Sequence, residues 1–331
     1  MRKPVVLGAV VIAVVAAGVA ARTRISPGPV ESKPATVAKG LDLSAVPADP
    51  PEGRVRMLFI HHSCGGQLLA PLGPDKDEHC IYASSQNGGG LRPMLDKAGY
   101  EVHEASYDSV VGHQTDMFDW LPKLRTQMDR ILITSHQDET YADGRKNQIV
   151  VFKSCFPNNA FVGEGTLPGN PAGPDLTVAN AKATLSALLP EIGKHPETLF
   201  VYVTPPPLAP RPEPMALWRF ALQRVRGGGA DAAYARQAAL ARELNNWVVS
   251  PEGWLSQYKG SNLVVFDYYG VLTDGRSNFS AFASEDGTDS HPLAEGNRRA
   301  AEAFVPLLNR AVRRAGLTGR TARADGSPSQ P

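Results

Sequence analysis

The chain has 331 residues, with 34 Lys and Arg side chains against 33 Asp and Glu. This length suits one large domain with tails, or two small domains. A balanced charge argues against nucleic-acid binding, which needs a basic patch or stripe, so no nucleic-acid partner is expected.

The N-terminus is expected to lie outside the folded domain. In residues 1–21, Arg2 and Lys3 precede an apolar run, the pattern of a signal peptide or an N-terminal membrane anchor. The run is shorter than the roughly 20 residues of a spanning helix. Export is therefore predicted, to the periplasm, to the extracellular space, or with the chain anchored to the membrane by this segment. The Pro- and Ala-rich residues 22–52 are a predicted linker.

The chain contains three cysteines, Cys64, Cys80 and Cys155. Export permits a disulfide, and the odd number leaves at least one thiol unpaired within the chain. Pairing of Cys64 with Cys80, pairing of Cys64 with Cys155, and three buried thiols are the alternatives that the sequence leaves open.

Short apolar runs with many β-branched residues have the composition of strands buried in a parallel sheet. They are Val55–Ile60, Glu101–Ala105, Ile131–Thr134, Ile149–Phe152, Leu199–Val203 and Leu263–Phe266. Segments with helical spacing lie between or after them. They are Leu91–Ala98, Val178–Ile192, Ala230–Trp247 and Ala294–Ala315. This alternation predicts an α/β fold: a doubly wound, flavodoxin-like, mostly parallel sheet of about five strands.

One folded domain is predicted for residues 53–315, followed by a disordered tail at 316–331 that is rich in Gly, Arg, Ser and Pro. Residues 205–260 form a Pro-rich and helical insertion within the domain. We expect this insertion to be either a lid or wall on the substrate side, or a structural cap over one edge of the sheet.

The pattern of polar residues at the ends of the predicted strands indicates a hydrolase. Ser63 follows the first strand in VRMLFIHHSCGG, and His291 precedes the last helix in DGTDSHPLAEGN. A serine hydroxyl is a poor nucleophile until a base takes its proton, and His291 is the candidate base. Ser63 lies too near the domain start to be the nucleophile elbow of an α/β-hydrolase, which follows several strands.

Separated segments resemble, in their order, the conserved blocks of the SGNH hydrolases, the GDSL-type esterase and lipase superfamily. These segments are FIHHSCGG, SYDSVVGHQTD, VVFKSCFPNN and DGTDSHPLAEGN. The resemblance covers roughly residues 53 to 312. The GDS string of the first block is absent, and His61-His62 replaces its Gly-Asp. The resemblance implies an SGNH-type fold and a serine esterase.

The resemblance also implies site residues. Ser63 would be the nucleophile and His291 the base, and no cofactor is expected. The oxyanion hole would use the N–H groups of Ser63 and Gly112 and the side-chain amide of Asn158, with Asn159 as the alternative.

The acid of the triad departs from the family pattern. The family places an Asp three residues before the histidine, where this chain has Thr288. Asp289 lies two residues before His291 and Asp286 five before, and Asp289 is predicted because it is nearer. The alternatives are Asp286 and a Ser-His dyad assisted by a backbone carbonyl.

Two other chemistries are weaker alternatives. Cys64 can replace Ser63 as the nucleophile, although export favours its oxidation. The second alternative is a metal site formed by three histidines and a carboxylate, namely His61, His62, His136 and Asp138. Adjacent histidines at a strand end point to opposite faces, so no metal is predicted.

The predicted function is an exported serine esterase that hydrolyses ester-linked acyl groups. Its predicted partner is a small ester or an acylated carbohydrate, with O-acetyl groups named by family analogy alone. The alternative is a non-catalytic envelope or carbohydrate-binding protein that retains the fold.

Overall fold

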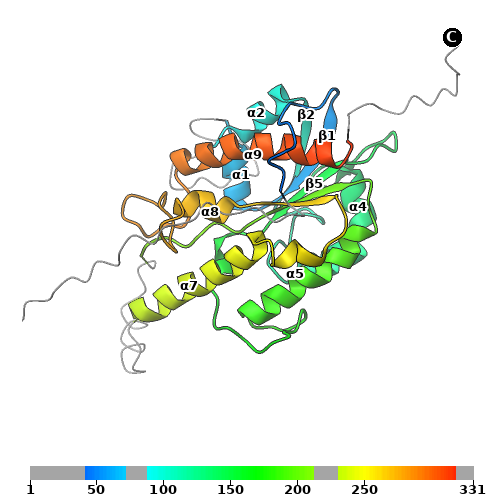
Figure 1. Cartoon of the computed structure of the whole chain (residues 1–331). Coiled ribbons are helices and arrows are strands. Elements are labelled where there is room, and N and C mark those ends of the chain that lie inside the picture. The colour runs from blue at the N-terminus through cyan, green and yellow to red at the C-terminus, as the bar shows by residue number, and fades with distance from the viewer. Residues whose placement is uncertain (1–41, 72–87, 212–229, 318–331) are drawn as a thin grey trace, which may run out of the picture. The chain divides into compact units, whose positions relative to one another are not determined.

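The computed structural model describes residues 42–71, 88–211 and 230–317. Their centre is a five-stranded sheet in the order β2-β1-β5-β6-β7, with every neighbouring pair parallel (Figure 1). The strands are β1 Val55–Ile60, β2 Tyr100–Ala105, β5 Ile149–Lys153, β6 Leu199–Val203 and β7 Leu263–Phe266. The predicted doubly wound α/β fold is confirmed. The strand order reverses between β1 and β5, which is where such sheets bind ligands.

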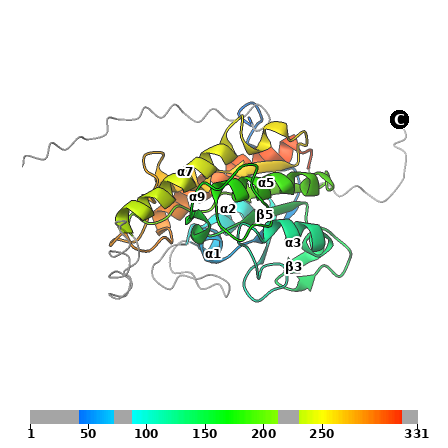
Figure 2. The same cartoon turned by 90° about the horizontal axis from the view of Figure 1, so that it is seen from below.

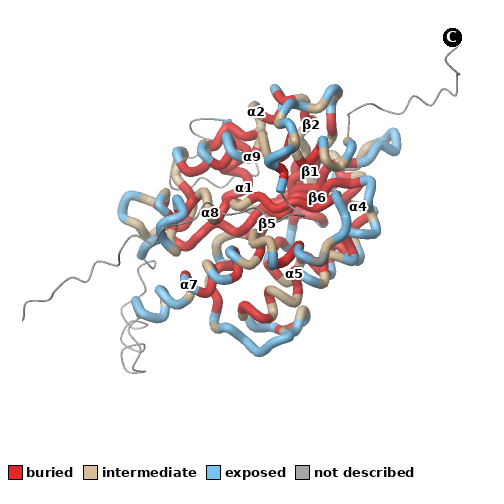
Figure 3. The backbone as a smooth tube through the Cα atoms, in the orientation of Figure 1, coloured by how far each residue is buried: buried red, intermediate tan, exposed pale blue. Residues whose placement is uncertain are grey.

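Helices cover both faces of the sheet, with α2 and α9 on one side and α5 and α7 on the other (Figures 1 and 2). Successive side chains of a strand point to opposite faces, so Met57 and Phe59 of β1 join one core while Leu58 and Ile60 join the other. All four are fully buried. Figure 3 shows the same burial along the central strands. Burial on both faces explains why the strands are nearly continuous apolar runs.

The first face is covered by the helices that flank the predicted serine and histidine segments. These helices are α1 Ser63–Leu69, α2 Leu91–Lys97, α8 Tyr268–Thr273 and α9 Ala294–Arg314. The second face is covered by α3 Trp120–Thr126, α4 Met128–Ile133, α5 Val178–Gly193 and α7 Ala230–Val249. The remaining short elements are the ribbon strands β3 Thr134–His136 and β4 Glu139–Thr140, and the 3₁₀ turns η1 Phe156–Asn159 and η2 Trp254–Gln257.

The strand predicted at Ile131–Thr134 is wrong. Ile131 and Leu132 are buried in α4, and a strand begins only at Thr134, which pairs antiparallel with Thr140 in the separate ribbon. A short β-branched apolar run has the same composition in a buried helix as in a buried strand, so the period alone cannot separate the two.

Two predicted peripheral segments pack onto the domain in part. Helix α7, from the predicted insertion at 205–260, buries Leu240 and Leu244 in the core of the second face. Leu43, near the end of the predicted linker, is buried against the first face, and the Asn309 side chain of α9 donates to the carbonyl of Ala48. The described parts of both segments therefore contribute to the layers around the sheet.

The predicted signal or anchor at 1–21, most of the linker at 22–52 and nearly all of the tail at 316–331 lie outside the described residues. Cys80 lies outside them as well. Within residues 42–71, 88–211 and 230–317, no helix has the length and apolar character needed to cross a membrane.

Phe304 tests the packing of α9 on the sheet. It is fully buried and meets the ring of Phe266 edge to face, with centroids 5.0 Å apart. Phe304→Ala should lower the free energy of unfolding by about 3–5 kcal/mol in urea titrations, because it leaves a cavity. Val162→Ala, at a side chain that is 68% exposed, should change it by less than about 0.5 kcal/mol. Equal losses in the two variants would contradict this packing.

Candidate active site

Ser63 lies at the carboxyl end of β1, as the first residue of α1. The strand ends at Ile60, and the amide of His61 still donates to the carbonyl of Ala105 in β2, at 3.1 Å. The chain then turns into α1, and Gly65 permits that turn, since a Cβ there would lie 2.4 Å from the Cβ of His61. Ser63 is therefore held at the sheet edge by regular structure on both sides, and it is 5% exposed.

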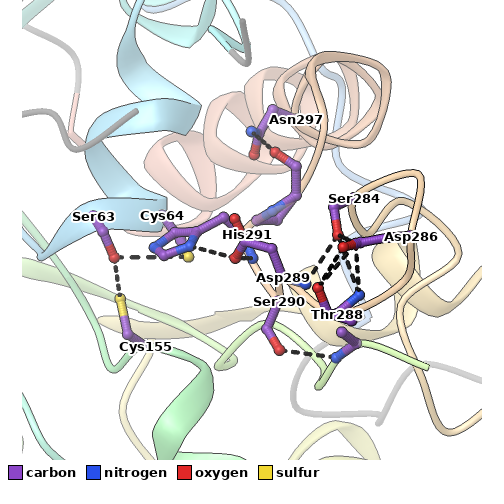
Figure 4. Close-up of polar contacts among 12 residues, drawn as sticks. Ser63, Cys64, Cys155, Ser284, Asp286, Thr288, Asp289, Ser290, His291 and Asn297 are labelled. Atoms are coloured by element: carbon purple, nitrogen blue, oxygen red, sulfur yellow. Dashed lines mark hydrogen bonds and ion pairs between the residues drawn. The ribbon is translucent and has the colours of Figure 1, made fainter. Parts of the chain in front are cut away.

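The hydroxyl of Ser63 contacts the sulfur atoms of two cysteines (Figure 4). Its Oγ lies 3.3 Å from Sγ of Cys155 and 3.9 Å from Sγ of Cys64. Both thiols are free, so the structure does not contain the Cys64–Cys155 disulfide considered from the sequence. Parallel pairing of β1 with β5 explains the contact, because Cys155 follows the end of β5 just as Ser63 follows the end of β1.

The two cysteines differ in pKa, and a buried lysine beside Cys155 is one of the causes. Lys153, at the end of β5, is fully buried, and its Nζ donates to Sγ of Cys155 at 3.3 Å. A hydrogen bond from Cys64 and the charge of Lys153 hold the pKa of Cys155 well below its usual range. Burial raises the pKa of Cys64 well above its usual range. These directions favour Cys155 over Cys64 as the thiolate of the pair, and a thiolate at Cys155 would accept from the Ser63 hydroxyl.

His291 lies on the loop before α9, with Asp289 as its partner. The Nδ1–H of the ring donates to Oδ1 of Asp289 at 2.7 Å, and the amide of His291 donates to the same oxygen at 2.9 Å (Figure 4). The side chain of Ser290 accepts from the amide of Ala209, which ties the loop to the chain that leaves β6. This geometry fixes the imidazole in one tautomer, with Nε2 left to accept a proton.

Asp286, the alternative acid, has a different role in the same loop. Its carboxylate accepts from the hydroxyl of Ser284, at 2.6 Å, and from the amide and hydroxyl of Thr288 (Figure 4). These hydrogen bonds lower the pKa of Asp286. Thr288, which occupies the position where the resemblance leads one to expect the acid, therefore closes a turn with Asp286, and Asp289 faces His291.

Ser63 and His291 both contact the segment that follows β5. Ser63 bonds to Cys155, and the ring of the next residue, Phe156, meets the His291 ring edge to face with centroids 5.0 Å apart. No hydrogen bond joins Ser63 to His291 among the described residues, and the hydroxyl bonds to sulfur instead. Catalytic hydrogen bonds are often made only in the substrate complex, and this one stays a prediction.

The donors predicted for the oxyanion hole are engaged elsewhere. The amide of Gly112 donates to Oγ of Ser109 at 2.9 Å. A side chain at Gly112 would collide with the backbone of Ser106, so the glycine permits a tight turn here. The side-chain amide of Asn158 donates to Asp116 at 2.8 Å, while its carbonyl oxygen accepts from the amide of Met117. Their part in an oxyanion hole stays a prediction.

Asn159, the alternative to Asn158, is fully buried and faces the interior. Its amide donates to the carbonyls of Pro205 and Pro206, and its oxygen accepts from Asn245 of α7. Asn159 thus joins η1 to the exit of β6 and to α7, and Asn158 joins η1 to the loop that contains Gly112.

The adjacent histidines before Ser63 point in different directions. His61 Nε2 bonds to the buried carboxylate of Glu104 at 3.0 Å. His62 Nε2 donates to the carbonyl of Gly112 at 2.7 Å, and burial lowers the pKa of His62. In the described part of the chain, no group of three or more His, Cys, Asp and Glu side chains is arranged to hold a metal ion.

Tyr107 is a site residue that the sequence analysis did not single out. The amide of Ser63 donates to the Tyr107 hydroxyl at 3.1 Å, and the Tyr107 ring stacks on His62 with centroids 3.9 Å apart. The only available signal was its position just after β2, in the segment SYDSVVGHQTD.

Comparison with known proteins gives likenesses in structure only. No family model matches the chain, and no curated protein matches its sequence. Solved structures that are similar include an acetylxylan esterase from Geobacillus stearothermophilus, which is 14% identical with a TM-score of 0.37 over 82% of this chain and 100% of that chain. A carbohydrate esterase family 2 enzyme with a carbohydrate-binding domain from Corynascus thermopiles is 15% identical, with a TM-score of 0.35 over 81% of this chain and 68% of that chain.

An extracellular lipase from Streptomyces rimosus is 12% identical, with a TM-score of 0.36 over 78% of this chain and 99% of that chain. These likenesses concern the fold alone.

The thiolate of Cys155 can be tested by alkylation. At pH 6 an ordinary thiol, with a pKa of about 8.5, is almost fully protonated and reacts slowly. We expect iodoacetamide to modify Cys155 nearly as fast at pH 6 as at pH 8, as followed by mass spectrometry of its peptide in a Cys80→Ser background. Lys153→Met should restore an ordinary rise of rate with pH. Cys64 serves as the unreactive control, and a wild-type rate that rises about tenfold per pH unit would contradict the thiolate.

Proposed function

We propose that this protein is a serine esterase that hydrolyses ester-linked acyl groups, with Ser63 as nucleophile, His291 as base and Asp289 as the acid that orients the base. The observation that carries the proposal is the 2.7 Å hydrogen bond between His291 Nδ1 and Asp289. This bond leaves Nε2 available to take a proton. The His291 ring contacts Phe156, which directly follows Cys155, and Cys155 contacts Ser63.

The reaction proceeds in two steps, acylation of Ser63 and hydrolysis of the acyl-serine. The Ser63 hydroxyl rotates from Cys155 to His291, its proton passes to Nε2, and its oxygen attacks the ester carbonyl carbon. The tetrahedral intermediate collapses, the bond to the alcohol oxygen breaks, and the imidazolium returns the proton to that oxygen. Water then attacks the acyl-serine with the same base, releasing the carboxylic acid and free Ser63.

The substrate class proposed is an acylated carbohydrate, with O-acetyl groups as the acyl part. Support comes from the resemblance of the sequence segments to a superfamily of esterases and lipases. Export is proposed on the charge and hydrophobicity of residues 1–21. The exported chain would meet acylated polysaccharide at or outside the cell surface.

The nucleophile is tested by comparing Ser63→Ala with Cys64→Ala. Ser63→Ala should abolish turnover of p-nitrophenyl acetate and labelling by a fluorophosphonate, because the alkoxide oxygen is missing. Cys64→Ala should keep both, and the Ser63→Ala variant should melt at the wild-type temperature. Loss only in Cys64→Ala would install the cysteine as nucleophile. A wild-type protein that neither turns over nor reacts would support the non-catalytic alternative.

The acid is tested by a matched pair of substitutions in one loop. Asp289→Asn should lower kcat by up to about 10⁴-fold, because the imidazole then has the wrong hydrogen-bond partner. Asp286→Asn should change kcat little, since that carboxylate bonds to Ser284 and Thr288. Damage only in Asp286→Asn would reverse the assignment. If neither substitution matters while His291→Ala is inactive, the enzyme works as a dyad.

A further inference from the structure

The amide of Ser63 already faces a hydroxyl. An oxyanion hole needs donors placed where negative charge develops on the substrate oxygen. The amide of Ser63 is such a donor, and the oxygen that it contacts in this structure is the phenol of Tyr107, at 3.1 Å. The other predicted donors, the amide of Gly112 and the side chain of Asn158, are occupied by Ser109 and Asp116.

We propose that the hydroxyl of Tyr107 is the second donor of the oxyanion hole and that Tyr107 is therefore a catalytic residue. This inference rests on the proposed function. When a substrate carbonyl oxygen accepts from the Ser63 amide, that amide no longer donates to the phenol, and the O–H of Tyr107 donates to the substrate oxygen beside it.

The protonation state of the phenol suits this role. Burial of Tyr107 raises its pKa, so the hydroxyl keeps its proton at neutral pH. The phenol oxygen accepts from the Ser63 amide, which leaves the O–H to donate. Among the described residues, the interactions of this hydroxyl are with Ser63 itself. To donate to a ligand, the O–H has to leave only the Ser63 side chain, which itself turns toward the substrate in the proposed reaction.

His62 holds the ring of Tyr107 from the side. The two rings are 19° from parallel, with centroids 3.9 Å apart, and His62 Nε2 is fixed by the carbonyl of Gly112 at 2.7 Å. The resemblance expects Asp at position 62, so the departure from the family string supplies the stacking surface for a tyrosine. The His62 ring is neutral at neutral pH, because burial lowers its pKa, and it adds no charge beside the hole.

The β3–β4 ribbon holds the backbone on both sides of Tyr107. The Gln137 side chain donates to the carbonyl of Tyr107 at 3.0 Å and accepts from the amide of Ser106 at 2.7 Å. Asp138 accepts from the amide of Val110 at 2.9 Å. Asp108 adopts a positive φ of 64°, which turns the chain directly after the tyrosine. A catalytic group needs this kind of support, because a small displacement of a donor costs much of its effect.

Tyr107→Phe is the decisive variant, because it keeps the stacked ring and removes only the oxygen. We expect kcat on p-nitrophenyl acetate to fall by about 10²–10³-fold with little change in KM, as for the loss of one oxyanion donor. The inhibition constant of a phenylboronic acid, whose tetrahedral adduct mimics the oxyanion, should rise in parallel. Tyr141→Phe removes a hydroxyl that bonds to Asn147 at 3.0 Å, and it should leave both values unchanged. Equal melting temperatures for both variants would exclude a folding defect.

The outcomes separate this inference from the proposed function. If Tyr107→Phe turns over at the wild-type rate or faster while Ser63→Ala is inactive, the phenol merely blocks the hole, and the inference on Tyr107 is overturned while the esterase stands. If Ser63→Ala keeps full turnover, the proposed function itself fails. A fall in kcat without weaker boronate binding would also overturn the role of Tyr107 as an oxyanion donor.

Discussion

The parallel pairing of β1 with β5 is the constraint on which the site depends. The register sets Leu58 opposite Val150 and Ile60 opposite Phe152, so both strands end at the same edge of the sheet. Ser63 and Cys155 are carried to that edge and touch there. Because each strand is buried on both faces, a one-residue shift in register would move every side chain into the opposite core, and the packing of the two cores therefore fixes the position of the serine.

Burial of the Lys153 side chain at this edge of the sheet costs free energy of folding. A fully buried ammonium needs a partner of opposite charge, since an unpaired charge in the interior is strongly destabilising. The partner at 3.3 Å is the sulfur of Cys155, whose pKa is held low by the hydrogen bond from Cys64 and by the charge of Lys153. The same sulfur contacts the Ser63 hydroxyl. Lys153 and the proposed nucleophile Ser63 thus contact the same sulfur atom, so chemistry at Cys155 is expected to affect Ser63.

The remaining groups of the site are set by loops that are tied to the sheet. Ser290 binds the histidine loop to the exit of β6, and Gln137 binds the tyrosine loop to the β3–β4 ribbon. Asn158 and Asn159 join η1 to the loop around Gly112 and to the exit of β6. Polar side chains in this structure therefore serve first to hold loops in place, and only some of them are free to act on a substrate.

The sequence by itself determined which segments form the central strands and most of the helices that cover them. Apolar runs such as Val55–Ile60 and Leu199–Val203 appear as strands over the predicted residues, because burial on both faces leaves a signal that needs no knowledge of neighbours. The strand predicted at Ile131–Thr134 was wrong for the same reason, since a helix buried on the second face has an equally apolar composition. Ser63 and His291 could be proposed from the sequence because they follow or precede such elements at short range, and their roles stay predictions.

Only the tertiary structure decided which groups meet. The approach of Tyr107 to the Ser63 amide joins residues from the ends of two strands, and the pairing of Lys153 with Cys155 depends on how a single strand end turns inward. Loop conformations likewise decide that the amide of Gly112 donates to Ser109 and that the side-chain amide of Asn158 donates to Asp116. Hydrogen bonds act over about 3 Å and depend on direction, and a linear pattern of residue types contains neither quantity.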